Sequence, residues 1–566
     1  MFYILFSVLF AVMAVLAALN GMRKGKKYIW SYSVARLVVA VISAVASALL
    51  SAKISFAGFR ALFKIAEGGS GNFAKLLTSV PLMSEALSAL ASMFVAPILF
   101  YVVFWLLRHV LDLVAKIVLR SIAKARAKKK GTLGVEENEP ETVEEDSVIS
   151  EKKAKKNKKN KKNKKKKKHK DDGYFRIRDK KNPLGKLCGA LCGLVVFLFT
   201  MIPAVGMLGI VNDMTAWGLA GSTHPVLQNI VEFVDAGANN FGAKAVRAMG
   251  GDALYSMMTT YEVDGEKATL AKETNLLGTV GHALSDMTNK DVPRKDAAES
   301  VQKIDEAFKE TTLIPSVLPD FLNASKTSWD AGEEYCGVKK PSFGKTDGLI
   351  HPILNVIGNS TKETMNDDVG TLVDSMAYMV EKDVLTDVKE DPMSMFKKKD
   401  VTEKVMCDLL KNKHLAPLVG DLSEFGIDLF GEAMGASMEN VDLDSSKIQN
   451  RELEAKLLAQ TLAEMAAMTE TVKTGGLKDL TAITTLGPLM DAMAATETIG
   501  KENTDKMMMN LLTSERLTSV TGLDAEKSRE AAEKINEGAK AVGYTSMLNE
   551  LATQIELAKK AAEMKP

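Results

Sequence analysis

Four apolar stretches dominate the first 211 residues of this 566-residue chain, at about residues 1–22, 33–53, 86–107 and 183–211. A helix of about 20 apolar residues spans the hydrocarbon of a bilayer, so we expect four transmembrane helices. The second stretch is the weakest, because it is free of charge only from Leu37 to Ala52. A re-entrant segment therefore remains an alternative there.

The first stretch carries no charge and is followed by the basic residues Arg23, Lys24, Lys26 and Lys27. A secretory signal peptide is the alternative, since Ala14 to Ala18 resembles a small-residue cleavage region. However, a signal peptide has its positive charge before the apolar run, not after it. We expect a retained anchor with its N-terminus outside the cytoplasm.

Beyond the third stretch, a charged residue recurs at every fourth position, at Arg108, Asp112, Lys116, Arg120 and Lys124. Valine, leucine and isoleucine fill the other positions. This pattern predicts an amphipathic extension to about residue 127, lying at the membrane interface.

Residues 128–182 form a charge-segregated segment, in which an acidic block precedes fourteen lysines within residues 152–170. The densest run is Lys164, Lys165, Lys166, Lys167 and Lys168. Such a composition predicts a disordered linker on the cytoplasmic side. One interpretation is attraction to anionic lipid head groups, with a binding free energy of about 1 kcal/mol per lysine near the surface. The alternative is a solvated segment that only enforces the topology of the neighbouring helices. Nucleic acid is disfavoured, because no aromatic residue interleaves the tract.

Charge divides the chain sharply despite a net charge of only +2. Residues 1–211 contain 36 Lys and Arg against 14 Asp and Glu, whereas residues 212–566 contain 37 against 57. The positive-inside rule places the lysine-rich segment in the cytoplasm. We therefore expect a multi-pass protein of the plasma (inner) membrane, with residues 212–566 outside.

Small residues recur at four-residue spacing in two of the apolar stretches. One face carries Gly185, Gly189 and Gly193, and another carries Ala40, Ala44, Ala48 and Ala52. Such faces let helix backbones approach closely in lipid, where no hydrophobic effect operates between helices. We expect helix packing there, either within the chain or in a homo-oligomer.

The acidic region, residues 212–566, has a hydrophobic period of about 3.6 residues and is expected to be a helical extracytoplasmic domain. Asp264-Gly265 between short alternating runs predicts one β-hairpin. The expected fold class is thus all-α, with a four-helix transmembrane module, a mainly helical soluble domain and one small β-hairpin.

Catalytic chemistry is weakly represented. Ser342 and Lys345 match Ser-x-x-Lys, and Lys473-Thr474-Gly475 follows, as in serine enzymes acting on peptidoglycan. Pro341 and Gly344 interrupt the helix that this chemistry needs, and no Ser-x-Asn motif lies between the fragments. No metal or cofactor pattern is present in the sequence, so we expect a non-enzyme without cofactor or metal. Whether Cys336 and Cys407 pair stays open.

The first 211 residues resemble the colicin V production protein (CvpA) family of bacterial inner-membrane proteins. The resemblance is carried by Gly21-Met22-Arg23-Lys24-Gly25 and by the run from Asn182 to Leu194, which includes the Gly185, Gly189 and Gly193 face. It implies four spans and a link to toxin production or export and to the cell envelope. The lysine-rich linker and residues 212–566 lie outside the family pattern.

Three functions follow from these patterns. The first is a non-enzymatic envelope protein whose extracytoplasmic domain binds an unknown protein or wall component. The second is an oligomeric channel or export component, with Asn20, Ser43 and Thr200 as candidate polar lining. The third, least favoured, is a peptidoglycan-active serine enzyme using Ser342 and Lys345.

Overall fold

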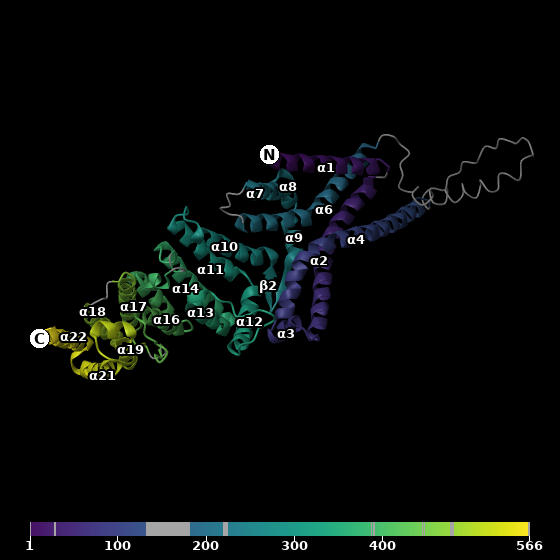
Figure 1. Cartoon of the computed structure of the whole chain (residues 1–566). Helices are drawn as coiled ribbons and strands as arrows, with labels where there is room; N and C mark the ends of the chain where they lie inside the picture. Colours follow the sequence, from purple (N-terminus) through teal and green to yellow (C-terminus); the bar gives the residue numbers. More distant parts are fainter. Residues whose placement is uncertain are drawn as a thin grey trace, which may run out of the picture. The chain divides into compact units, whose positions relative to one another are not determined.

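The computed structural model describes residues 2–27, 30–131, 182–218, 225–386, 388, 391–443, 445, 448–475 and 480–563. These residues are mainly helical, and the only sheet among them has two strands (Figure 1). The predicted all-α class with one small hairpin is confirmed. The described residues form two compact units, with Met1–Phe63, Leu87–Glu262 and Lys267–Ala271 in the first and the remainder in the second.

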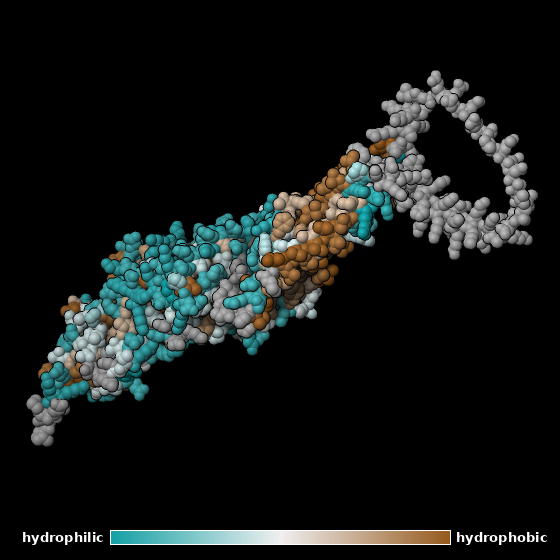
Figure 2. Space-filling view, turned by 90° about the horizontal axis from the view of Figure 1, so that it is seen from above, coloured by the Kyte–Doolittle hydropathy of each residue, from teal (hydrophilic) through white to brown (hydrophobic). Residues whose placement is uncertain are grey.

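Four helices in the described part of the chain are long and apolar enough to cross a membrane. They are α1 (Phe2–Gly25), α2 (Trp30–Glu67), α4 (Met83–Gly131) and α6 (Pro183–Gly218). Apolar side chains gather on the molecular surface there (Figure 2), among them Ile4, Val102 and Trp105. A turn does not interrupt α2, whose 38 residues form one continuous helix. Both α2 and α4 are therefore longer than the apolar stretches from which they were predicted.

Three short helices complete the first unit: α7 (Pro225–Asn239), α8 (Phe241–Ala248) and α9 (Gly251–Thr259). Phe233 of α7 packs edge-on against Phe2 and Phe6 of α1, with ring centroids 5.4 and 5.0 Å apart. Asn240 caps α8, because its side chain accepts hydrogen bonds from the backbone N–H groups of residues 242 and 243. The chain after α6 thus packs back onto α1, which the sequence did not indicate.

The hairpin consists of β1 (Thr260–Val263) and β2 (Glu266–Thr269). Asp264 and Gly265 form the turn with φ values of 54° and 77°. Two successive residues with positive φ characterise a type I′ turn, for which Asp-Gly is a favoured sequence. The predicted hairpin is confirmed at the expected residues.

The second unit begins with residues Lys64–Ala86, from the end of α2 to the start of α4. This segment contains α3 (Asn72–Ser79). Most of the unit comes from the acidic region. Its helices are α10 (Leu270–Thr288), α11 (Arg294–Glu310), α12 (Leu313–Asp330), α13 (Asp347–Asn359), α14 (Lys362–Glu381), α15 (Lys399–Lys411), α16 (Pro417–Met434), α17 (Arg451–Lys473), α18 (Thr481–Ala494), α19 (Gly500–Leu512), α20 (Glu515–Thr521), α21 (Ala525–Val542) and α22 (Tyr544–Glu563), with the 3₁₀ turns η1 (Gly344–Thr346) and η2 (Pro392–Phe396).

The main core of the second unit extends from residue 384 to residue 555 and is rich in methionine. Leu458, Leu462 and Met465 of α17 are fully buried in it. Methionine side chains are unbranched and flexible, so they fill irregular space between helices that cross at different angles. This packing fixes α13 to α16, the helices that surround an apolar cavity.

Candidate functional site

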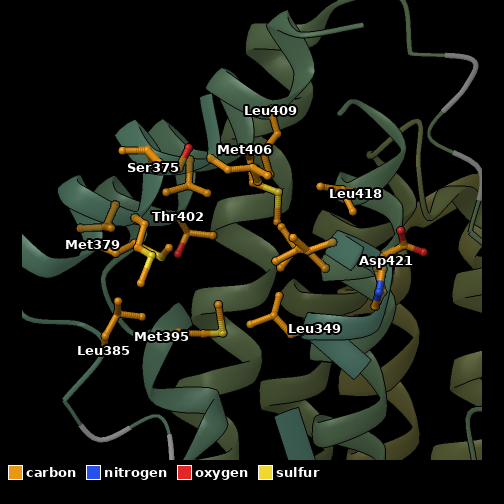
Figure 3. Close-up of a pocket in the computed structure, with 18 of the residues that line it drawn as sticks. Leu349, Ser375, Met379, Leu385, Met395, Thr402, Met406, Leu409, Leu418 and Asp421 are labelled. Carbon is orange, nitrogen blue, oxygen red and sulfur yellow. The ribbon is translucent and has the colours of Figure 1, made fainter. Parts of the chain in front are cut away.

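An apolar cavity of about 420 Å³ lies among α13, α14, η2, α15 and α16 (Figure 3). Its walls are almost entirely aliphatic, methionine and phenylalanine side chains, including Leu349, Met379, Met395, Met406 and Leu418. The helices present these residues at three- and four-residue spacing, which places them on one face of each helix. Ligand pockets in proteins commonly have volumes of about 300–1,000 Å³, so this cavity has the size of a small-molecule site.

Three polar side chains interrupt the apolar lining: Ser375, Thr402 and Asp421. The Ser375 side chain is buried, and among the described residues its hydroxyl has no hydrogen-bond partner. Thr402 donates to the Lys398 carbonyl over 3.3 Å. A buried hydroxyl without a partner costs about 1–3 kcal/mol, so Ser375 would gain from a polar group on a bound molecule.

Asp421 lies at the cavity on α16, near two further acidic residues of that helix. Burial raises the pKa of the Asp421 carboxyl above its usual range. The pKa of Glu424 is raised by burial and then by the charges of Asp428 and Asp421, and that of Asp428 by burial. A carboxyl with a raised pKa takes up a proton more readily and can then donate a hydrogen bond.

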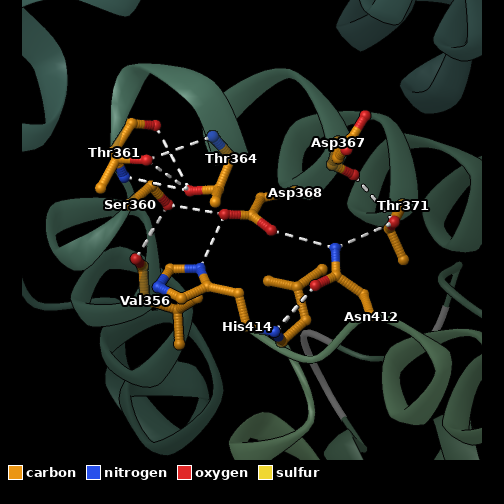
Figure 4. A network of polar contacts seen from close by, with 10 residues as sticks. Val356, Ser360, Thr361, Thr364, Asp367, Asp368, Thr371, Asn412 and His414 are labelled. Atoms are coloured by element: carbon orange, nitrogen blue, oxygen red, sulfur yellow. Dashed lines mark hydrogen bonds and ion pairs between the residues drawn. The ribbon is translucent and has the colours of Figure 1, made fainter.

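A polar network centred on Asp368 is the second feature of α14 (Figure 4). One carboxylate oxygen of Asp368 accepts from Ser360 over 2.9 Å and contacts Nδ1 of His414 at 2.7 Å. The other oxygen accepts from the Asn412 amide over 3.0 Å. Asp368 is only 1% exposed, so these three partners stabilise a buried carboxylate.

The combination of serine, histidine and aspartate in this network differs from a catalytic triad. A triad needs the histidine between the nucleophile and the carboxylate, so that the ring can take the serine proton. Here Ser360 and His414 both contact the same oxygen of Asp368. The network instead joins α14 to the segment before α16, because Asp368 contacts both Asn412 and His414. Asn412 also orders that segment, since its side-chain oxygen accepts from the backbone N–H groups of His414 and Leu415.

The Ser-x-x-Lys fragment is split between two separate partners. The Ser342 hydroxyl donates to Asp347 over 3.2 Å, whereas Lys345 pairs with Glu432 at 2.8 Å. Lys473 pairs with Asp391 at 2.7 Å. Each lysine thus has a carboxylate partner rather than the serine that an acyl-transfer mechanism would activate.

The glycine face of α6 lies against α1. A Cβ atom built on Gly25 would come 2.7 Å from the Cα of Gly189, and one built on Gly193 would overlap the Ala17 carbonyl. Gly185 faces Gly25 in the same way. On α2, the side chains of Ala40, Ala44 and Ala48 are fully buried and that of Ala52 is 8% exposed. Ala44 and Ala48 share a core cluster with Ala96 and Phe100 of α4.

Other residues singled out from the sequence have simpler surroundings. Arg23, Lys24, Lys26 and Lys27 are exposed at the end of α1, and Lys164 to Lys168 lie outside the described residues.

All four cysteines are free, so Cys336 and Cys407 do not pair in this structure. Asn20 lines a second, smaller cavity, Ser43 is fully buried and Thr200 donates to the Phe197 carbonyl. Across the described residues, no group of three His, Cys, Asp or Glu side chains could hold a metal ion.

No family model, curated protein or solved structure matches this chain. The site is therefore interpreted from its own geometry. Sequence reasoning missed the apolar cavity, because its walls come from five segments that each have an ordinary helical pattern. It also missed Asp368 and His414, which are 46 positions apart. One sequence signal could have indicated Asp368: it occupies a position on the apolar face of α14, among residues that are buried in the structure.

Proposed function

We propose that this chain is a membrane-anchored, non-enzymatic binding protein whose helical domain holds an apolar molecule in the cavity among α13 to α16. The cavity carries the proposal, because its volume of about 420 Å³ and its aliphatic walls suit an acyl chain. The flexible side chains of Met376, Met379 and Met406 would adapt to such a chain. Ser375 and Asp421 would hydrogen-bond to its polar end.

The proposed location of the binding domain is outside the cytoplasm. The positive-inside rule supports it, since a basic cluster ends α1 and the lysine-rich segment follows α4 in the sequence. The loop between α2 and α4 belongs to the same unit as the binding domain. Within that unit, Ser79 of α3 is hydrogen-bonded to Tyr335, and the Lys75 ammonium lies 5.8 Å from the centroid of the same ring. The loop and the domain would then share one side of the membrane.

A role in the cell envelope, or in toxin production or export, would follow from the CvpA-like arrangement of the first 211 residues. An acyl-chain binder on the outer side of the plasma membrane would suit the handling of lipidated envelope components. We do not favour the oligomeric channel, because its two candidate packing faces contact helices of the same chain.

The test is photocrosslinking of the full-length protein in lipid nanodiscs with a diazirine-bearing sixteen-carbon fatty acid. We expect adducts on peptides from α14 and α15, mapped by mass spectrometry. Val405→Trp would fill the cavity and remove these adducts, whereas Lys404→Trp, on the exposed side of α15, would retain them. Adducts on α1, α2, α4 and α6 serve as an internal control for lipid-facing labelling. Adducts confined to the membrane helices, or unchanged by Val405→Trp, would overturn the proposal.

A further inference from the structure

A second cavity, of about 210 Å³, lies among the four membrane helices next to the last two turns of α1. Its charged lining consists of Lys24 from α1, Arg36 from α2 and Arg108 from α4. Asn20 and Ser33 add an amide and a hydroxyl. Three basic groups from three different helices thus converge on one space, and the sequence separates the outermost two by 84 positions.

One nearby carboxylate is already shared by other groups. Asp112 pairs with Arg36 at 3.5 Å and with Lys116 at 3.1 Å, and it accepts a hydrogen bond from Tyr32 over 3.1 Å. In the part of the chain that the structure describes, no carboxylate lies within 4.0 Å of Lys24 or Arg108. The cavity therefore has an excess of positive charge, which is costly among membrane helices unless an anion compensates it.

We propose that this cavity binds the phosphate group of an anionic membrane lipid. Arginine presents a planar fork of N–H donors that matches phosphate oxygens, and lysine adds a mobile point charge. Asn20 and Ser33 can donate to the remaining oxygens. The glycines of α1 and α6 at the cavity wall carry no side chains that would fill this space.

The position of the cavity favours a lipid over a free ion. It adjoins the end of α1 that carries Arg23 to Lys27, which marks the head-group level of the bilayer. Exposed apolar side chains lie on the same helices, with Val38 at 50% and Trp105 at 64% exposure. Acyl chains could follow these side chains while the phosphate lies between Arg36 and Arg108. Basic pockets between transmembrane helices bind lipid phosphates in this manner.

The test uses native mass spectrometry of the full-length protein from mixed micelles with equal amounts of phosphatidylglycerol and phosphatidylcholine. We expect retained phosphatidylglycerol to predominate. Arg108→Gln should reduce this preference by about fivefold to tenfold, as expected for the loss of one charge near the lipid phosphate. Arg108→Lys should keep most of the preference. Lys53→Gln, 17 positions beyond Arg36 on α2, should keep all of it.

Further arms separate the sources of the effect. A variant lacking residues 152–170 should keep the preference, because Lys24, Arg36 and Arg108 remain in place to bind the phosphate. Inorganic phosphate should not raise the melting temperature in neutral detergent as phosphatidylglycerol does. Lys24→Gln provides a second measurement if Arg108→Gln fails to fold. The proposal would be overturned by equal retention of both lipids, by preference lost with the lysine tract, or by stabilisation from inorganic phosphate alone.

Discussion

Gly21 of α1 and Gly189 of α6 lie in backbone contact, so close that a Cβ atom built on either residue would overlap the carbonyl oxygen of the other. Gly25 and Gly185 repeat the arrangement one turn away. The close packing of these two helices therefore requires glycine, which has no Cβ atom, at all four positions. Close packing replaces the hydrophobic effect as the source of their affinity in lipid.

Gly21→Ala is expected to lower the stability of the protein by about 1–3 kcal/mol, the usual cost of overpacking a close contact. The melting temperature of the purified protein in detergent measures the effect. Gly58→Ala is the matched control, since Gly58 is also in a membrane helix and a Cβ there meets nothing within 4 Å. Equal melting temperatures for the two variants would contradict the contact.

Asp368→Asn should destabilise the helical domain by about 2–4 kcal/mol, because it removes the charge that holds His414 and leaves an amide donor facing another donor. Denaturant unfolding monitored on the full chain measures the loss. Asp367→Asn is the control, since Asp367 is the exposed neighbour on α14. A comparable loss from both variants would argue against the buried network.

The pairing of Asp368 with His414 predicts energetic coupling. Combining Asp368→Asn with His414→Ala should cost less than the sum of the two single changes, by about 0.5–3 kcal/mol. A double-mutant cycle on the same unfolding assay measures this coupling. Strict additivity would mean that the two side chains do not interact in solution.

Glu273 predicts a pH dependence for the start of α12. Its carboxylate accepts hydrogen bonds from the backbone N–H groups of Thr312 and Leu313 over 2.8 and 3.1 Å. Burial raises the pKa of Glu273 above its usual value, and these backbone hydrogen bonds only partly offset the effect. The folded state therefore binds the proton more tightly than the unfolded state. This stability is present below the unfolded pKa and is lost as pH rises through the folded pKa.

Hydrogen exchange of α12 amides in the full-length protein should accordingly be slowest near pH 4, after correction for intrinsic rates, and faster towards pH 7. Glu273→Gln should flatten this dependence, because its side-chain carbonyl still accepts from the two N–H groups without titrating. A variant that retains the full pH dependence would place its origin in other carboxyls, such as Asp421.

The proposed topology predicts selective labelling of cysteines in intact cells. A membrane-impermeant maleimide should modify Cys336, which lies next to Tyr335 in the second unit, and should spare a cysteine introduced by Ser147→Cys. Cys336→Ser supplies the background for the first site. Labelling at position 147 alone would invert the orientation and place the binding domain in the cytoplasm.

Local patterns predicted the elements well. Asp264-Gly265 predicted its hairpin because a type I′ turn depends on two adjacent residues. The apolar stretches predicted four membrane helices, although not their lengths. Leu453 and Leu458 are both apolar positions of α17, yet Leu453 is 50% exposed whereas Leu458 is fully buried. Periodicity identifies a helix and its apolar face, but the neighbouring helices decide how far along the helix that face is covered.

The candidate sites could not be predicted in this way, because each depends on convergence. Arg36 and Arg108 belong to different helices and have unremarkable neighbours in the sequence. The apolar cavity forms where the buried faces of several helices do not fill the space between them, and the pattern of each helix alone predicts only that its apolar face is buried. Neither arrangement leaves a short-range signal, so only the packed structure brings the residues together.

The contact between α1 and α6 also has a consequence for how the protein is made. Gly21 leaves the ribosome 168 residues before Gly189, a delay of roughly ten to thirty seconds at ordinary rates of translation. During that interval the glycine face of α1 lacks the α6 surface that it contacts in the folded protein, and the lysine-rich segment is synthesised before α6. The pairing of α1 with α6 is therefore completed late, after the lysine-rich segment and α6 have been synthesised.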